Sequence, residues 1–319
     1  MFNHRVSTFI VSVAFMVLAA CGGGGSGGSS PPAPPAPNTA TLPITAANAQ
    51  DITVTVLEAV TSTADIVSIV DVIGLPPTGT TNQGLARALV ADIFAETTAC
   101  DSGEVTTTWD DADNNLAIST GDTFDILFDM CFDAELEATL DGASSLTNMV
   151  VTGDPFIQIV PWGLTTTLGF DNLSVTDSVD AVIIDGSLDL VLSSDDNVVV
   201  DVSIATDSLT AQQSGIGETL SAYVLTQTVD LNALTQVIST SGIFTSTELG
   251  GSVTFETLED FVLMGDDNPS SGALLISDSS SSVLVTVLDN INAQLEIDLD
   301  LDGTIDETLV VTWASLDIR

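Results

Sequence analysis

The sequence predicts a mainly β protein with one large antiparallel curved sheet of about ten to twelve strands, barrel-like or a sandwich, and one or two N-terminal helices. After Cys100, apolar and polar residues alternate at the period of two that marks strands with one buried face. Before Cys100, apolar residues recur at helical spacing. Turn dipeptides separate the alternating runs: Asp141-Gly142, Asp185-Gly186, Gly250-Gly251 and Asp302-Gly303.

The N-terminus has the three parts of an export signal: Arg5, an apolar run over residues 9–18, and small residues before Cys21. The run is too short for a membrane-spanning helix, which needs about 20 apolar residues. Leu18-Ala19-Ala20-Cys21 resembles the lipobox of bacterial lipoproteins. The resemblance implies that residues 1–20 are removed and that acyl chains such as palmitate on Cys21 anchor the protein in a membrane. The alternative is an ordinary secretory signal that leaves Cys21 as a free thiol.

The chain after the signal divides into a tether and one domain. Residues 21–43 are predicted to be the lipidated cysteine and a tether rich in glycine, serine and proline. Residues 44–319 are predicted to form a single extracytoplasmic domain, with a helical lead-in over 45–95 and strands over 100–319. By resemblance to the sorting rule of Gram-negative lipoproteins, Gly22 favours the outer membrane of the cell envelope, at its periplasmic face or at the cell surface.

The lead-in contains the predicted helices. Thr45 is the expected N-cap of the first helix. Its apolar stripe consists of Ile52, Val56, Leu57 and Val60, continued by Ile66, Ile69, Val70 and Ile73. Leu75-Pro76-Pro77-Thr78-Gly79 ends this segment, and a short helix is expected at about residues 84–95.

Four alternating runs carry the strand prediction. Their apolar members are Phe124, Ile126, Phe128 and Met130; Val182, Ile184, Leu188, Leu190 and Leu192; Val198, Val200, Val202 and Ile204; and Leu295, Ile297, Leu299 and Leu301. Acidic residues occupy many of the positions between them, including Asp298, Asp300 and Asp302 in the last run. The acidic side chains are therefore expected on the solvent face of the strands.

The net charge limits the choice of partners. Asp and Glu number 45, Lys and Arg together number 3, and the formal net charge is −42 at pH 7. Once the signal is removed, Arg87 and Arg319 are the only strong bases. Such a surface repels polyanions, so the composition argues against nucleic-acid binding. The self-repulsion of the carboxylates calls for screening by salt or by bound divalent cations.

Cys100 and Cys131 are predicted to form a disulfide, because two further cysteines in an exported protein usually pair. Expected strands at 103–109 and 121–132 flank a loop at 111–122, which puts the cysteines nearly opposite each other across one hairpin. Chain entropy assigns about 3–4 kcal/mol to such a closure. A redox-active pair, the alternative, more often has Cys-x-x-Cys spacing.

The loop between these two strands matches part of the twelve-residue calcium loop. Its oxygen-bearing side chains at positions 1, 3, 5, 9 and 12 are Asp111, Asp113, Asn115, Ser119 and Asp122. Leu116 stands where glycine usually makes the sharp turn, and Asp122 is shorter than the usual bidentate glutamate. Because the segments on either side of the loop are predicted to be strands, the pattern predicts a calcium loop on a hairpin and not an EF-hand.

A second acidic loop near the C-terminus has the same kind of pattern. Asp298, Asp300, Asp302 and Gly303 match the start of the calcium loop, with Asp306 at position 9. Leu309 stands at position 12, so a closing acid is missing unless Glu307 turns in. Calcium would bind such loops with a Kd of about 10⁻⁴–10⁻³ M. The alternative is that Asp298 and Asp300 face solvent on a strand and Asp302-Gly303 is a simple turn.

The residues that are missing exclude most catalytic mechanisms. The chain has no lysine, and its one histidine, His4, lies in the signal. Nucleophiles activated by histidine or lysine, Schiff bases, and zinc or copper sites built on histidine or cysteine are therefore excluded. A carboxylate pair of the glycosidase type beside Trp109, Trp162 or Trp313 remains as an alternative. The sequence predicts a protein that is not an enzyme.

Several features together resemble a group of uncharacterised proteobacterial lipoproteins. They are the lipobox, the Gly/Pro tether, Ile44-Thr45-Ala46-Ala47-Asn48-Ala49, the hairpin from Cys100-Asp101-Ser102-Gly103 to Gly121-Asp122 with Cys131, and the acidic C-terminal hairpin ending in Thr312-Trp313. The resemblance implies location and architecture, since the group has no assigned activity. We expect a membrane-anchored envelope lipoprotein with a structural or binding role, stabilised by Ca²⁺, with an envelope protein as partner. The alternative is a carrier or sensor that holds a lipid or another apolar ligand in a cavity of the curved sheet.

Overall fold

The computed structural model describes residues 41–64, 95–115, 118–133, 137–155, 159–177, 181–265 and 268–316. In these ranges the chain forms one α-helix, a short 3-10 helix and fourteen strands in a single sheet. The helices are α2 (Ala49–Ala64) and η2 (Trp313–Ser315). The strands are β1 (Ala95–Ala99), β2 (Ser102–Asp110), β3 (Thr123–Asp133), β4 (Ala138–Asp154), β5 (Ile159–Thr176), β6 (Ala181–Ser194), β7 (Val199–Gln213), β8 (Ile216–Asp230), β9 (Thr235–Ser246), β10 (Gly251–Met264), β11 (Ser271–Ser277), β12 (Ser282–Val287), β13 (Asn292–Asp298) and β14 (Glu307–Thr312).

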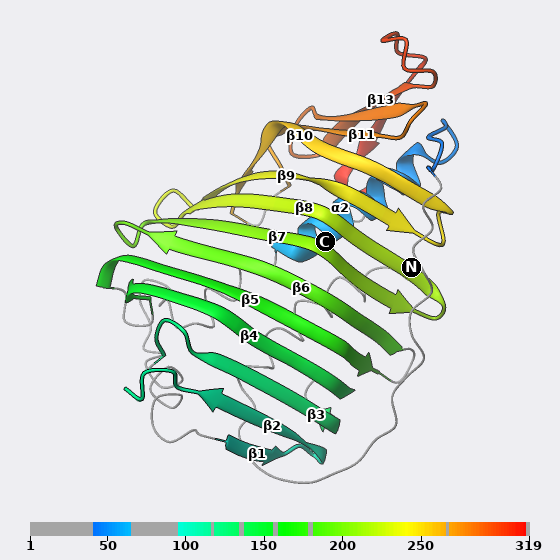
Figure 1. Ribbon diagram of the computed structural model, residues 1–319. Coiled ribbons are helices and arrows are strands. Elements are labelled where there is room, and N and C mark those ends of the chain that lie inside the picture. Colours follow the sequence, from blue (N-terminus) through cyan, green and yellow to red (C-terminus); the bar gives the residue numbers. More distant parts are fainter. Residues whose placement is uncertain are drawn as a thin grey trace.

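The sheet is an antiparallel meander in which each strand pairs with the next one along the chain, from β1 to β14. Helix α2 contacts both β8 and β13, so the sheet bends around the helix (Figure 1). The predicted curved antiparallel sheet with an N-terminal helix is confirmed. It is a single open sheet with β1 and β14 at its edges, and its strands outnumber the ten to twelve expected.

Because the chain reverses at every strand, its loops alternate between two ends of the sheet. The N-terminal segment joins one of these ends, which we call the proximal end: Thr41 bridges Ser252 at the start of β10, and the Ile44 N–H donates to Ser281 Oγ in the β11–β12 turn at 2.7 Å. The β13–β14 loop also lies at the proximal end. The β2–β3, β8–β9 and β12–β13 loops lie at the opposite end, which we call the distal end.

The core is one cluster of buried apolar side chains that come from α2 and from the strands of the sheet. The predicted stripe of Ile52, Val56, Leu57 and Val60 is buried, which confirms this part of the helical pattern. Burial of each such side chain contributes about 1.5–3 kcal/mol relative to exposure. Regular helix begins at Ala49, four residues after the expected N-cap Thr45. The residues between them form a turn, in which Asn48 Oδ1 accepts the Thr45 N–H at 2.7 Å. The stripe over 66–73, the turn over 75–79 and most of the predicted helix at 84–95 lie outside the described residues.

The last residues of the predicted tether contact the folded domain. The sequence predicts a tether that ends at residue 43, but Leu42 is buried and its N–H donates to the Ser252 carbonyl at 3.1 Å. A backbone partner and an apolar environment therefore fix residues 41–43 to the domain. The predicted signal, Cys21 and the remainder of the tether lie outside the described residues. In the part of the chain that the structure describes, no helix is long and apolar enough to cross a membrane.

Two of the predicted turns are bulges inside strands. Gly142 in β4 has φ +113°, and a Cβ atom there would lie 2.5 Å from the Asn172 carbonyl oxygen. Gly186 in β6 has φ +123° and is equally close to the Ser208 carbonyl. The predictions of turns at Asp141-Gly142 and Asp185-Gly186 are therefore wrong, because these glycines accommodate register shifts within the ladder. Gly250 and Gly303 do lie in loops, as predicted.

The alternation also fails at three predicted positions, which are exposed and not buried. Met130 follows Phe128 by two residues but is 59% exposed, because the register shift between Phe128 and Cys131 turns Cys131 toward the core instead. Leu299 and Leu301 are exposed because β13 ends at Asp298, which is itself buried. The predicted apolar positions of the two central runs, from Val182 to Ile204, are buried except Val198, which is half-buried in the β6–β7 loop.

Some aspartates on the outer face of the sheet accept hydrogen bonds from threonine hydroxyl groups and form no salt bridge with a described residue. The described part of the chain contains no lysine, arginine or histidine. Asp189 accepts a hydrogen bond from Thr167 Oγ1 at 2.6 Å, and Asp201 accepts one from Thr228 Oγ1 at 2.7 Å. Each pair links adjacent strands. Cross-strand hydrogen bonds thus support the sheet where other proteins use opposite charges.

Candidate metal centres

Two groups of aspartates bring three carboxylates each within metal-binding reach. One consists of Asp111, Asp113 and Asp122, and the other of Asp298, Asp300 and Asp306. Within each group, one carboxylate oxygen per residue lies within 4.8 Å of those of the other two. We call them the distal triad and the proximal triad, after the ends of the sheet at which they lie. Both belong to loops in which the sequence predicted calcium binding.

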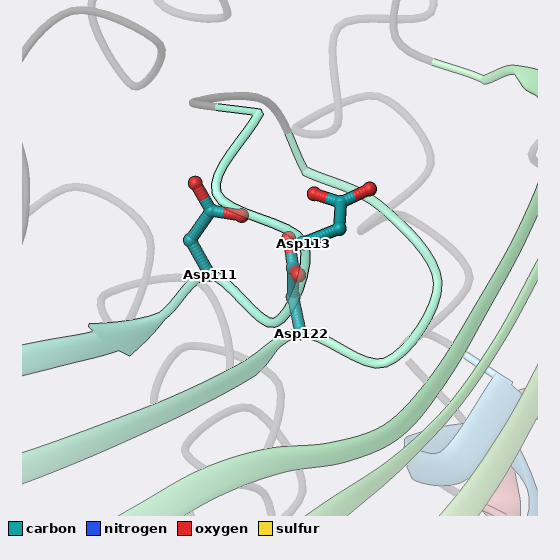
Figure 2. A group of neighbouring side chains, drawn as sticks. All are labelled: Asp111, Asp113 and Asp122. Carbon is teal, nitrogen blue, oxygen red and sulfur yellow. The ribbon is translucent and has the colours of Figure 1, made fainter.

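The distal triad forms where the β2–β3 loop leaves one strand and returns to the next (Figure 2). Asp111 directly follows β2, and Asp122 directly precedes β3. The open end of the same hairpin is closed by the disulfide between Cys100 and Cys131, with a Cα–Cα distance of 5.3 Å. The predicted pairing of these cysteines is therefore confirmed. The disulfide and the strand ladder together limit how far the two ends of the acidic loop can separate.

Asp122 organises the distal triad from a fully buried position. Its carboxylate accepts hydrogen bonds from the Ala112 N–H at 3.0 Å, the Ser119 N–H at 2.9 Å and the Ser119 hydroxyl at 3.3 Å. It also accepts the indole N–H of Trp109 at 3.3 Å, and the Trp109 ring stacks on Phe124. These four hydrogen bonds fix the orientation of the Asp122 carboxylate.

The other predicted ligands of this loop support the carboxylates. The Asn115 N–H donates to both Asp111 Oδ1 and Asp113 Oδ1 at 3.2 Å, and its amide Nδ2 donates to Asp113 Oδ2 at 2.9 Å. Ser119 donates to Asp122. Of the five predicted ligands, the structure therefore places three carboxylates together and uses the other two to orient them. Leu116, at the position of the usual glycine, lies outside the described residues.

The proximal triad is ordered almost entirely by backbone donors. Asp298 accepts the N–H groups of Asp300 at 3.3 Å and Gly303 at 3.0 Å. Asp306 accepts the N–H of Leu299 at 2.8 Å, so it closes the loop across seven residues. Asp302, the fourth predicted aspartate, lies outside the triad and accepts the Thr304 N–H at 2.7 Å.

The arrangement of each triad favours a hard cation. Like charges held this close repel one another, and the described part of the chain supplies no basic side chain to offset the repulsion. Carboxylate oxygens are the ligands that Ca²⁺ and Mg²⁺ prefer. Ca²⁺ accepts irregular geometry and six to eight oxygens, so backbone carbonyls and water would complete a shell begun by three aspartates. Either triad could hold a divalent cation.

Other carboxylates carry shifted pKa values that the sequence analysis did not anticipate. Asp196 and Asp289 lie in hairpin turns, and the backbone N–H groups of Val199 and Val198, and of Ile291 and Asn292, lower their pKa values. Glu218, on β8, is affected in the opposite direction: burial, and then the nearby charge of Glu248, raise its pKa to about 7. Asp196 and Asp289 each precede an asparagine at a turn, a pattern visible in the sequence, whereas no local pattern marks Glu218.

All three predicted tryptophans are buried and serve the structure. Besides Trp109, the indole N–H of Trp162 donates to Asn197 Oδ1 at 2.8 Å, and that of Trp313 donates to the Asp289 carbonyl at 3.1 Å. Their rings are therefore not exposed as platforms for stacking a sugar.

Comparisons of the chain with protein-family models, with curated proteins and with solved structures found no match. The resemblance to proteobacterial lipoproteins therefore stays a prediction that rests on the quoted motifs.

Proposed function

We propose that this protein is a membrane-anchored lipoprotein of the cell envelope, with a non-enzymatic structural or binding role and with a domain stabilised by Ca²⁺. The observation that carries the proposal is the pair of aspartate triads, each with carboxylate oxygens within 4.8 Å of one another. The lipobox at Cys21 supports the anchor, and the absence of lysine and of histidine beyond His4 supports the non-enzymatic role.

Calcium binding follows from the balance of charge in the triads. A divalent cation replaces repulsion among three carboxylates by attraction, and it binds the folded loops but not the unfolded chain. Binding to the native state alone stabilises it by RT ln(1 + [Ca²⁺]/Kd). With a Kd of about 10⁻⁴–10⁻³ M, 10 mM Ca²⁺ would add roughly 1.4–2.7 kcal/mol per site.

A thermal-unfolding titration of the full chain in detergent tests this proposal. We expect Tm to rise through the millimolar Ca²⁺ range, and to rise less with Mg²⁺ at equal ionic strength, because Mg²⁺ demands near-octahedral geometry. A shift reproduced by NaCl at equal ionic strength would show screening and contradict site binding.

Matched variants assign the effect to the triads. Asp113→Asn and Asp300→Asn each remove one exposed member of a triad, whereas Asp125→Asn removes an exposed carboxylate outside both. The two triad variants should each lose part of the Ca²⁺-dependent shift, and Asp125→Asn should keep it. Equal shifts in all three variants would refute both sites. Labelling of Cys21 with palmitate, lost in Cys21→Ala, tests the anchor.

The apolar-carrier alternative has one observation in its favour. Ser144 Oγ, Thr206 Oγ1 and Gln227 Oε1 are buried without a hydrogen-bond partner among the described residues. Their strand neighbours Phe170, Tyr223 and Ile238 are buried as well. A ligand with polar groups would satisfy such atoms. Native mass spectrometry of the purified full chain tests this: a co-purified lipid supports a carrier, and a ligand-free mass contradicts it.

A further inference from the structure

Among the described residues, five large apolar side chains are exposed at one side of the distal end, on the β8–β9 and β12–β13 loops and at the last residue of β10. They are Leu231, Leu234, Met264, Leu288 and Ile291, and each is between 44% and 66% exposed. We call them the distal patch. Single exposed apolar residues are normal on a protein surface, whereas a contiguous group marks a site of interaction.

Hydrogen bonds between the loops link the segments that carry these side chains. The Gly265 N–H donates to the Leu234 carbonyl at 2.7 Å, which places Met264 beside the β8–β9 turn. Asn268 Nδ2 donates to the Asn290 carbonyl at 3.0 Å, which joins the chain after β10 to the β12–β13 turn. The distal patch therefore extends over three adjacent loops.

The same pattern of hydrogen bonds orders the β8–β9 and β12–β13 turns: one aspartate oxygen accepts two backbone N–H groups. In the β8–β9 turn, Asp230 Oδ1 accepts the N–H groups of Asn232 and Ala233 at 2.9 and 2.8 Å. In the β12–β13 turn, Asp289 Oδ1 accepts those of Ile291 and Asn292 at 2.8 and 2.7 Å. Both turns are thus preformed, so a partner would not have to order them on binding.

The charge around the patch decides the kind of partner. Asp230 and Asp289 form an acidic rim, and no basic side chain occurs in the described part of the chain. A second copy of this chain would bring the same negative charge. A membrane is disfavoured by position, because the N-terminal segment, which follows the proposed anchor, joins the sheet at the proximal end.

We propose that the distal patch is the docking surface for another protein that presents apolar side chains flanked by lysine or arginine. Apolar contacts at the centre would supply affinity, and the acidic rim would steer and orient the cationic partner. This inference goes beyond calcium binding and does not depend on it.

A synthetic peptide of alternating leucine and lysine serves as the probe, and one of alternating serine and lysine, of equal length and charge, as its control. Binding to the full chain in detergent is measured by calorimetry. We expect the leucine peptide to bind at least about tenfold more tightly than the control. The difference should disappear in the double variant Leu234→Ser, Met264→Ser.

The matched control variant is Leu127→Ser with Leu258→Ser, which removes two side chains of similar exposure on β3 and β10. It should keep the preference for the leucine peptide. Equal binding of both peptides, or equal loss in both variants, would overturn the proposal.

Two further outcomes would assign the patch to a different occupant and overturn the proposal as well. One is self-association in sedimentation velocity that Leu234→Ser, Met264→Ser abolishes. The other is quenching of tryptophan emission by brominated phosphatidylcholine in proteoliposomes. Trp313 reports on the distal end because its N–H donates to the Ile291 carbonyl at 2.9 Å.

Discussion

The two triads place the same number of carboxylates in different surroundings. In the distal triad Asp122 is fully buried and accepts a hydrogen bond from the Trp109 ring, which lies on the preceding strand. In the proximal triad Asp298 is buried but Asp300 and Asp306 are exposed, and the donors are N–H groups of the same short loop. A carboxylate bonded to the core supports the fold without any ion, whereas one bonded only within its own loop leaves the fold nearly unaffected when it is lost.

The flanking structure extends the contrast. A disulfide closes the hairpin of the distal triad, whereas the hairpin of the proximal triad ends at the sheet edge, β14. The proximal loop also exposes Leu299, Leu301 and Ile305. We therefore expect the distal loop to be preformed and the proximal loop to gain more order from an ion.

The largest expected effect comes from the disulfide. The double variant Cys100→Ser, Cys131→Ser should lower the free energy of unfolding by about 3 kcal/mol, because it releases a loop closure in the unfolded chain. Urea denaturation followed by circular dichroism measures this. Both cysteines lie on the hairpin of the distal triad, so the Ca²⁺-dependent rise in Tm should also shrink.

The part of the Ca²⁺-dependent rise in Tm that comes from the distal triad should be the part that is lost. Combined with Asp300→Asn, which weakens the proximal triad, the cysteine double variant should show almost no Ca²⁺ response. Combined with Asp113→Asn it should keep the response of the proximal triad. If the cysteine double variant reduced the Ca²⁺ response of both triads equally, the result would contradict the inference that the distal loop is the preformed one.

A smaller effect should separate the triads in the absence of calcium. Asp122→Asn places an amide among four donors, which costs about 1–3 kcal/mol because buried donors lose their acceptor. Asp306→Asn removes an exposed group, so its effect on unfolding should stay within about 0.5 kcal/mol. Chemical denaturation in EDTA measures both.

Tryptophan fluorescence provides a second measurement for this pair of variants. Asp122→Asn alters the hydrogen bond to Trp109 and should shift the emission spectrum, whereas Asp306→Asn should leave it unchanged. Trp109→Phe identifies the responsible ring. Equal costs of Asp122→Asn and Asp306→Asn in EDTA would remove the distinction between a structural and an ion-dependent triad.

Strands, the helix and the acidic loops could be predicted from the sequence where the period of the apolar residues and the local composition determine them. The alternation from Val182 to Ile204, the helical stripe from Ile52 to Val60, and the two acidic loops could all be predicted. The bulges at Gly142 and Gly186 could not, because Asp-Gly fits a turn as well as a register shift and only the neighbouring strand decides. The burial of Asp122 depends on Trp109, whose position follows from the β2–β3 pairing.

Glu218 and Glu248 provide a reference for the proximal triad at the same end of the sheet, since they are two interacting carboxylates outside either triad. Burial, and then Glu248, raise the pKa of Glu218 from 4.5 to about 7. A carboxyl whose pKa is raised on folding contributes stability as the neutral acid. That stability is fully present below pH 4.5 and is lost as the pH rises through 7.

Between pH 4.5 and 8, Glu218 should therefore lower the free energy of unfolding by on the order of 1–2 kcal/mol, after allowance for solvent screening. Glu218→Gln should remove this decline, and Glu248→Gln should reduce it only in part, because burial is the larger cause. Glu256→Gln, at an exposed position on β10, is the control. Urea denaturation across this pH range measures the effect. If the decline persists in Glu218→Gln and responds instead to Asp300→Asn, the proximal triad and not this pair is the carboxylate group that ionisation destabilises near neutral pH.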